Sequence, residues 1–161
     1  MAVAQVVARI SLPIALILGV ALATAAPVAA GETASQFDRI EASATSKIGA
    51  PWVHYAKGPD KFDCVGFVWW AYNEHGLKDK IGGYRGVAGY FKWFKSRGLV
   101  SKTKAHKGDL IVWGRNQHIG IYLGSGMAIS ALVKPYGVKV HKVKGWLNIP
   151  FKAYLHVKIT R

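Results

Sequence analysis

The sequence predicts an α+β domain, in which helices come first along the chain and an antiparallel sheet of about five strands follows. Up to Gly98 the apolar residues recur at the three- and four-residue intervals of helices. From Leu99 onward, short apolar runs are separated by polar and glycine-containing turns, as is typical of strands. Because helices and strands are segregated along the chain, the pattern indicates the α+β class.

Three segments are expected to be helices. Residues 35–48 place four apolar side chains on one face and begin with Ser35 and Asp38, which form a capping pair. Residues 64–75 contain no proline, and residues 87–98 again carry four apolar side chains at helical spacing. A glycine follows or closes each segment, which is a common helix stop.

Five apolar runs are expected to be strands of one antiparallel sheet. They cover residues 109–113, 118–123, 127–132, 138–143 and 153–159. The sequence Gly124-Ser125-Gly126 between the second and third runs predicts a tight hairpin turn.

The first thirty residues are expected to be a secretory signal and not part of the fold. Residues 1–30 carry one charge, Arg9, followed by an uncharged apolar run that ends in Val28-Ala29-Ala30, a typical cleavage pattern. The alternative is an uncleaved anchor, because the run is long enough to span a bilayer, and this would be the only membrane contact. Helix-breaking prolines in the run favour cleavage, so we expect residues 31–161 to form one exported domain.

The exported part of the chain is strongly basic. Without Arg9, 21 Lys and Arg face 8 acidic residues, and from Phe91 onward 14 basic residues face a single acid, Asp109. Such a surface concentrates polyanions, which for an exported protein are cell-wall polymers and membrane headgroups. Nucleic acid is not an expected partner. The alternative is that the lysines only serve solubility and protect sheet edges from pairing.

Cys64 is the only cysteine of the chain, and it stands at the start of a predicted helix behind Asp63, the expected N-cap. The positive end of the helix dipole favours a thiolate, so we expect the pKa of Cys64 to be lowered. The alternative is a buried, inert thiol, which is common for free cysteines. An exported chain with one cysteine cannot form an internal disulfide, and this favours a chemical role.

A thiolate nucleophile needs a base, and His118 is the best placed of six histidines. It begins a strongly apolar strand directly after a polar loop, so it lies at a sheet end where loops meet. The other five lie at a helix end, in loops or in lysine-rich strands; these are His54, His75, His106, His141 and His156. No cysteine or histidine pair has zinc-binding spacing, so neither a metal nor a nucleotide cofactor is expected.

Two stretches, GAPWVHYAKGPDKFDCVGF and KGDLIVWGRNQHIGIYLGSGMAIS, resemble the NlpC family of papain-like cysteine peptidases, bacterial enzymes that cut peptidoglycan stem peptides. The resemblance runs from about Ile48 to Ser130. It implies a papain-like fold in which Cys64 is the nucleophile and His118 the base. A third polar residue of the family orients the base, and its position falls on Ser130.

The sequence departs from the family pattern at three positions. The third residue is usually histidine, sometimes asparagine or glutamine, whereas Ser130 offers one uncharged hydroxyl. Val65 replaces a serine, and Trp52 replaces a tyrosine, although its indole can still stack on a substrate or donate a hydrogen bond. We expect Trp52 and Asp63 to contribute to substrate binding.

The leading hypothesis is a monomeric cysteine hydrolase, secreted or associated with the cell wall, that cleaves an amide bond of peptidoglycan. By the resemblance, the bond lies between γ-linked D-glutamate and the following diamino acid, although a wall amidase cutting nearer the sugar is also compatible. The competing hypothesis is a catalytically decayed module that binds anionic wall polymers through its positive charge. Acyl transfer on lipid is a third hypothesis, and it rests on fold analogy alone.

Overall fold

The computed structural model describes residues 34–161, so the predicted signal and its cleavage site lie outside the described residues. The helices are α1 (Gln36–Thr45), α2 (Cys64–Asn73), the short 3-10 helix η1 (Lys78–Ile81) and α3 (Val87–Lys95). The capping box predicted for α1 is confirmed, because the Ser35 hydroxyl accepts the Asp38 N–H while the Asp38 carboxylate accepts the Ser35 N–H. Among the described residues, none of the helices combines the length and apolarity needed to span a bilayer.

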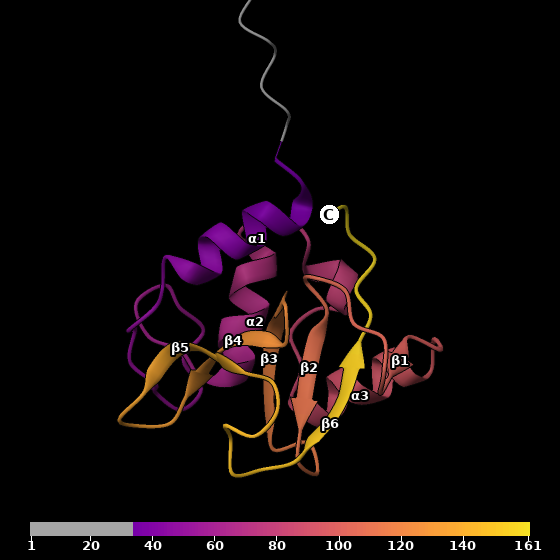
Figure 1. The fold of residues 1–161 in the computed structure, drawn as a ribbon. Helices are drawn as coiled ribbons and strands as arrows, with labels where there is room; N and C mark the ends of the chain where they lie inside the picture. The colour runs from indigo at the N-terminus through magenta and orange to yellow at the C-terminus, as the bar shows by residue number, and fades with distance from the viewer. Residues whose placement is uncertain (1–33) are drawn as a thin grey trace, which may run out of the picture. The chain divides into compact units, whose positions relative to one another are not determined.

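In the described part of the chain, six strands form one antiparallel sheet in the order β1-β6-β2-β3-β4-β5 (Figure 1). Their bounds are β1 (Val100–Ser101), β2 (Leu110–Trp113), β3 (His118–Gly124), β4 (Met127–Leu132), β5 (Gly137–Lys142) and β6 (Phe151–Leu155). The predicted hairpin turn joins β3 to β4, with Ser125 in the left-handed region at φ 49°. The α+β class is confirmed, with helices preceding the sheet along the chain.

Two differences from the sequence prediction concern the edge of the sheet. The two-residue strand β1, which pairs with β6, was not predicted, because two residues are too few to show an alternating pattern. Strand β6 begins at Phe151 and ends at Leu155, whereas residues 153–159 were predicted. The chain leaves the sheet after Leu155 because the segment that follows bonds elsewhere: the Val157 N–H donates to the Asp109 carboxylate, and the Thr160 carbonyl accepts the Phe37 N–H.

The main core lies between the helices and one face of the sheet. Helix α2 packs on β3 and β4, and α1 packs on α2. The alternation along the strands separates two buried clusters: Leu110 and Val112 of β2 belong to the main core, whereas Ile111 and Trp113 belong to a smaller cluster on the other face. Both faces of β2 are therefore buried, which explains its uninterrupted apolar sequence.

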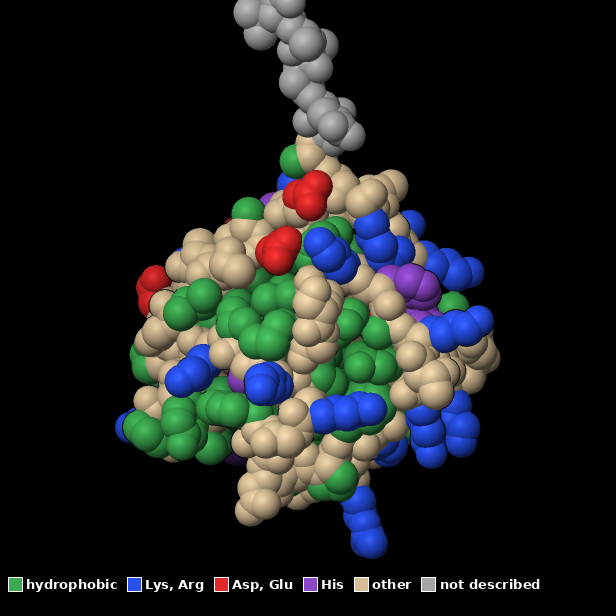
Figure 2. Space-filling view, viewed as in Figure 1, with side chains coloured by type: hydrophobic (Ala, Val, Ile, Leu, Met, Phe, Trp, Pro, Cys, Tyr) green, Lys and Arg blue, Asp and Glu red, His purple; other side chains and the backbone are tan. Residues whose placement is uncertain are grey.

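The surface is predominantly basic, as the composition predicts. Figure 2 shows hydrophobic side chains gathered across the middle of one face, with lysine and arginine around them and the few visible acidic side chains toward its upper part. Several large hydrophobic side chains are exposed, among them Tyr55, Val133 and Tyr136. The last two of these belong to the segment between β4 and β5.

Candidate active site

Cys64 is the first residue of α2, and the predicted N-cap is confirmed. The Asp63 Oδ1 atom accepts the Gly66 N–H at 2.6 Å, and Oδ2 accepts the Tyr55 N–H at 2.9 Å. Asp63 is buried and uses both carboxylate oxygens to fasten the preceding loop to the helix start. Its role in substrate binding stays a prediction.

Glycine at position 66 allows this loop to lie directly on the first turn of α2. A Cβ atom at Gly66 would lie 2.0 Å from the Ala56 carbonyl oxygen, and the Asp63 N–H donates to that same oxygen at 2.9 Å. No side chain fits in this space. The sequence Cys-Val-Gly therefore positions the thiol by letting the backbone of the loop approach the helix start closely.

The pKa of Cys64 departs from the ordinary thiol value in the direction opposite to the one predicted from the helix dipole. Burial, and then the adjacent Asp63 carboxylate, raise the pKa of Cys64 to about 11, while the N–H groups of Ile119, Val65 and Cys64 itself act to lower it. Desolvation therefore outweighs the helix N-terminus. At neutral pH the resting group is a thiol.

His118, the first residue of β3, lies against Ser130 of β4, as the family resemblance implies. The His118 Nε2 atom and the Ser130 Oγ atom are 2.8 Å apart. The approach of the two strands requires Gly120: a Cβ atom there would lie 2.9 Å from the Ser130 Cβ and 2.8 Å from the Ile129 carbonyl oxygen. Gly120, two residues after His118, therefore allows the contact between His118 and Ser130.

A second histidine completes this cluster, and the sequence reasoning missed it. The His141 Nε2 atom of β5 lies 2.8 Å from Ser130 Oγ, and His141 Nδ1 lies 3.0 Å from the Lys142 carbonyl oxygen. Three side chains from adjacent strands therefore form one hydrogen-bonded chain, His118–Ser130–His141. The pairing of β4 with β5 is the feature that could have indicated His141. Ser130 pairs with Lys139, and residue 141 lies two residues further along β5, on the same face of the sheet as Ser130.

Two tryptophans hold the imidazole rings of the chain. Trp113 is fully buried, its Nε1 donates to the Val143 carbonyl oxygen at 2.8 Å, and its ring lies 5.4 Å from that of His118 and 5.5 Å from that of His141. Trp146 stacks on His141 at a centroid distance of 5.0 Å. Aromatic surfaces restrict both rings to orientations that keep their bonds to Ser130.

Burial, and then the neighbouring His141, lower the pKa of His118 to about 3, so the imidazole is neutral at neutral pH. Cys64 lies beside β3, where the N–H of Ile119, the residue after His118, interacts with the thiol. Within residues 34–161 no hydrogen bond joins the Cys64 sulfur to the His118 ring. In the resting site, Cys64 at the start of α2 is a thiol and His118 at the start of β3 is a neutral imidazole, and these two elements pack against each other.

The predicted substrate-binding residue Trp52 lines a cavity of about 490 Å³. The other lining residues are Val53, His54, Val133 and Lys134. One wall of the cavity is formed by residues 52–54. This segment is joined to the chain just before the nucleophile, because the Val53 N–H donates to the carbonyl oxygen of Phe62, two residues before Cys64. The other wall is formed by Val133 and Lys134, which directly follow β4 and begin three residues after Ser130. This cavity, with its aromatic wall, therefore borders the segments that carry the site.

Tyr84 is close enough to Cys64 and Asp63 for their charges to act on its hydroxyl. Burial, and then the Asp63 and Cys64 groups, raise the pKa of Tyr84. Its ring meets Trp69 edge to face at 5.9 Å, and the Lys57 ammonium lies 3.9 Å from its centroid. A cation and partly exposed aromatic rings are therefore available next to the thiol for a polar, anionic substrate.

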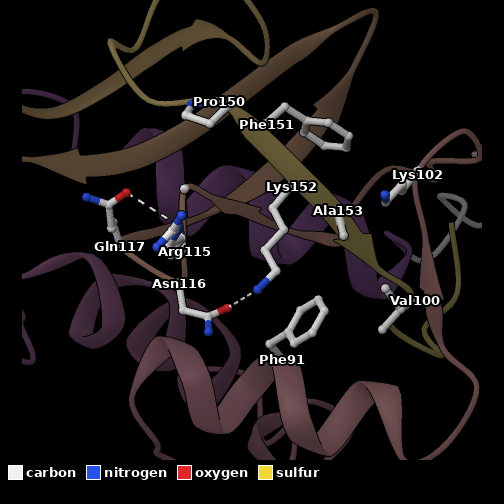
Figure 3. Close-up of a pocket in the computed structure, with 11 residues that line it drawn as sticks. Phe91, Val100, Lys102, Arg115, Asn116, Gln117, Pro150, Phe151, Lys152 and Ala153 are labelled. Atoms are coloured by element: carbon white, nitrogen blue, oxygen red, sulfur yellow. Dashed lines mark hydrogen bonds between the residues drawn. The ribbon is translucent and has the colours of Figure 1, made fainter.

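A larger cavity, of about 710 Å³, opens between α3, the start of β6 and the loop that leads to His118 (Figure 3). Lys152 extends between its apolar walls, donates to Asn116 Oδ1 at 2.7 Å and lies 3.9 Å from the Phe91 ring centroid. Lys102 and Arg115 add two more cations to the lining. The cavity does not contain Cys64, His118 or Ser130, so it is a separate cationic surface next to the site.

Within residues 34–161, one other cluster has ligand atoms close enough for a metal ion. The ligand atoms of His106, Asp109 and His156 lie within 4.8 Å of one another. The buried Asp109 carboxylate, however, already accepts from His156 Nδ1 at 2.7 Å, from Arg161 Nη2 at 3.2 Å and from the N–H groups of His106 and Val157. A guanidinium that shares this carboxylate disfavours a cation, so we assign the cluster to fastening the C-terminal segment.

The chain is similar to known proteins. The model of the NlpC/P60 family matches residues 49–154. The chain is 29% identical over 116 residues to "Probable endopeptidase p60" of Listeria grayi, covering 70% of this chain and 21% of that protein. It is 32% identical over 112 residues to a "Probable endopeptidase" of Corynebacterium glutamicum (strain R), covering 68% and 49%. The chain thus spans between a fifth and a half of the length of these two relatives.

Solved structures give the same assignment. The NlpC/p60 domain of the peptidoglycan hydrolase SagA is 35% identical and superposes with a TM-score of 0.59, over 74% of this chain and 98% of that one. NlpC1 from Trichomonas vaginalis shares the fold, with a TM-score of 0.65 at 23% identity over 81% of this chain and 46% of that one. The fold is therefore papain-like, as expected from the resemblance. With nearly two thirds of its residues matched by the family model, the chain belongs to the NlpC/P60 family.

Proposed function

We propose that this protein is an exported cysteine hydrolase that cleaves an amide bond in peptidoglycan stem peptides. The observation that carries the proposal is the bond between His118 Nε2 and the buried Ser130 hydroxyl, next to the helix start that presents the only cysteine. The names of the relatives, two probable endopeptidases and a peptidoglycan hydrolase, support this class of reaction. We also propose that it acts as a monomer outside the cytoplasm, after removal of residues 1–30.

In the proposed first step, His118 takes the thiol proton as the Cys64 sulfur attacks the amide carbonyl carbon. A carbon–sulfur bond forms, and the carbonyl electrons move to oxygen. When the tetrahedral intermediate collapses, the carbon–nitrogen bond breaks and the amine leaves with the proton from His118. The product is a thioester on Cys64. Both groups are neutral at rest, so the thiol proton has to be transferred to His118 within this step.

In the second step, water resolves the thioester. His118 accepts a proton from the water, whose oxygen attacks the thioester carbonyl, and the carbon–sulfur bond then breaks. The proton returns to the sulfur, which restores the thiol and releases a carboxylic acid. Backbone N–H groups at the start of α2, including that of Cys64, would stabilise the oxyanion in both steps.

For the substrate, we propose a stem peptide cut between γ-linked D-glutamate and the following diamino acid; an amidase acting nearer the sugar is the variant of this proposal. Trp52 would stack on the substrate from its cavity, and the Lys57 and Lys134 ammonium groups would attract its carboxylates. Asp63 would contribute by holding the Tyr55 loop that borders the same region.

The test is release of peptide. The purified protein is incubated with soluble muropeptides, and new amines and their masses are measured. Wild type is expected to release a fragment with a new amino terminus on the diamino acid, whereas Cys64→Ala releases none. The proposal fails if wild type releases no more amine than Cys64→Ala. A new terminus nearer the sugar would assign the amidase variant.

A second candidate function, a decayed module that binds the wall, is favoured by the raised pKa of Cys64 and by the serine at the third catalytic position. Slow alkylation of the thiol at neutral pH is expected for both candidates, because burial disfavours the thiolate in either case. Peptide release separates them, since a decayed module binds walls and releases nothing.

Binding of anionic wall polymers is a further part of the proposal. The cavity lined by Lys102, Arg115 and Lys152 offers three cations beside apolar walls. Sedimentation with isolated walls is expected to weaken as salt is raised, and Lys102→Gln with Arg115→Gln is expected to weaken it at low salt. Lys78→Gln with Lys80→Gln, on η1, is the matched control for the loss of two positive charges. Equal binding by both double variants would contradict this part.

A further inference from the structure

The hydrogen bonds of the His118–Ser130–His141 chain have a direction that is set at its buried end. The Lys142 carbonyl oxygen carries no proton, so His141 Nδ1, 3.0 Å away, must be the donor. Burial lowers the pKa of His141, and a neutral imidazole that is protonated on Nδ1 has its lone pair on Nε2. His141 Nε2 therefore accepts the hydroxyl proton of Ser130.

The direction of this bond then determines the tautomer of His118. With its proton donated to His141, the Ser130 oxygen can only accept, so His118 Nε2 must be the protonated nitrogen. The lone pair of a neutral His118 is then on Nδ1. This is the nitrogen that is free of the chain, and only an unprotonated nitrogen can take a proton from a thiol.

A serine alone would not fix this tautomer, because a hydroxyl both donates and accepts. Without an acceptor on its other side, the Ser130 hydroxyl could donate to His118 Nε2. Nδ1 would then carry the proton, and His118 could not act as a base toward Cys64 from that nitrogen. A serine at this position is therefore a weak orienting residue because its hydroxyl does not by itself fix the direction of the hydrogen bond to His118.

We propose that His141 is a positioning residue that fixes the direction of the Ser130 hydroxyl and thereby keeps His118 in the tautomer that can accept the thiol proton. The proposal rests on the proposed function for the role of His118 as base. The serine and the second histidine act jointly, because together they replace a single orienting side chain, with the Lys142 carbonyl as the fixed end.

The surroundings of His141 suit this role. Its side chain is 3% exposed, and Trp146 and Trp113 pack on its ring, so water does not compete readily for Nε2. Phenylalanine at this position keeps an aromatic ring between the same neighbours but has no acceptor. Glutamine keeps an acceptor oxygen near the place of Nε2. The two substitutions thus separate ring packing from hydrogen bonding.

The chain also offers a matched control outside the site. His75 Nε2 lies 2.9 Å from the Ser43 hydroxyl, in a second serine–histidine pair between the C-terminal end of α2 and α1. His75→Phe removes the same kind of contact without touching His118. It is expected to leave both the His118 tautomer and the peptidase activity unchanged.

The first experiment observes the tautomer directly. The protein is labelled with ¹⁵N-histidine, and nitrogen–proton correlation spectra are recorded without substrate at neutral pH. In wild type, His118 Nε2 is expected to give a protonated-type resonance and Nδ1 an unprotonated one. In His141→Phe the two forms become mixed or exchange, whereas His141→Gln and His75→Phe resemble wild type. Unchanged His118 resonances in a folded His141→Phe variant would overturn the proposal.

The second experiment is a double-mutant cycle on peptide release. His141→Phe is expected to lower kcat several-fold with KM nearly unchanged, in proportion to the fraction of His118 that leaves the competent tautomer. In a Ser130→Ala background, the same substitution should have little further effect, because the link is already broken. Additive losses would overturn the proposal, since they would indicate independent structural roles.

The two readouts separate failure of this proposal from failure of the proposed function. If the tautomer responds to His141→Phe while no variant, wild type included, releases peptide, control of the tautomer stands and the hydrolase proposal fails. If wild type releases peptide and the tautomer does not respond, the hydrolase stands and this proposal fails. Should His141→Phe not fold, Ser130→Ala provides the same spectral test, with mixed tautomers expected.

Discussion

Two clusters of this protein each hold histidines by hydrogen bonds, but the histidines bond to a charged group in one cluster and to a neutral group in the other. Around Asp109, a buried carboxylate bonds to His156 and Arg161 and fastens the end of the chain. Around Ser130, a neutral hydroxyl lies between His118 and His141, and no charged side chain takes part in the chain of hydrogen bonds. The only acid after Phe91 is thus used for structure, while the candidate catalytic cluster is neutral.

The difference follows from what each cluster must do. A carboxylate that pairs with a guanidinium holds distant segments together, because a buried charge without its partners is costly. A base must instead be neutral when the substrate arrives, and burial among neutral partners keeps His118 in its neutral form at neutral pH. We expect substitutions in the first cluster to change stability and substitutions in the second to change turnover.

Asp109→Asn should have the largest effect on stability. The amide keeps the shape, but it removes the charge that faces Arg161 and turns one acceptor into a donor against protein N–H groups. Loss of a buried partner of this kind costs about 3–5 kcal/mol. Urea unfolding followed by tryptophan fluorescence measures the cost. Peptide release per folded molecule should change little, and a large fall in kcat without loss of stability would reverse the assignment of the two clusters.

Ser130→Ala should have the opposite profile. It removes the acceptor for His118 and the donor to His141, so we expect kcat to fall about 100-fold. Stability should fall by only about 1–3 kcal/mol, because the partner histidines are left without one bond each. Steady-state kinetics and urea unfolding of the same preparation provide both numbers. A fully active Ser130→Ala variant would show that the chain of hydrogen bonds does not serve catalysis.

A smaller effect should appear in the pH dependence of stability. The folded pKa of His118 lies below the unfolded value near 6.5, so between these values the unfolded state binds the extra proton and stability falls as the pH falls. One such group contributes about 1.4 kcal/mol per pH unit below pH 6.5. His118→Gln should lose this contribution. Equal slopes for wild type and His118→Gln between about pH 6 and 5 would mean that the imidazole is not buried in its neutral form.

The sequence was sufficient for residues whose role depends on local pattern. The Asp63 cap, the start of α2 at Cys64 and the position of His118 at the beginning of β3 follow from motifs and periodicity. The contact between His118 and Ser130 was implied by the family resemblance and is present in the structure. These features are encoded within a few residues of one another or in a familiar spacing.

Properties that arise from packing could not be predicted in this way. The helix N-terminus suggested a lowered pKa for Cys64, but burial and Asp63 raise it, and burial is a property of the assembled core. The position of His141 among lysines along the chain does not indicate a role in the site, yet strand pairing turns it toward Ser130, while the adjacent Lys142 alternates to the other face. A residue's neighbours across a sheet, more than those along the chain, decide its chemistry here.

The most direct test of the central claim is to trap the thioester. The protein is mixed with muropeptide, quenched in acid within milliseconds to seconds and digested, and the peptide that contains Cys64 is weighed by mass spectrometry. We predict an adduct on Cys64 equal to the acyl part of the cleaved substrate, absent from Cys64→Ala and reduced in His118→Ala. Release of amine by Cys64→Ala at the wild-type rate, or an acyl adduct on a different residue, would contradict the account.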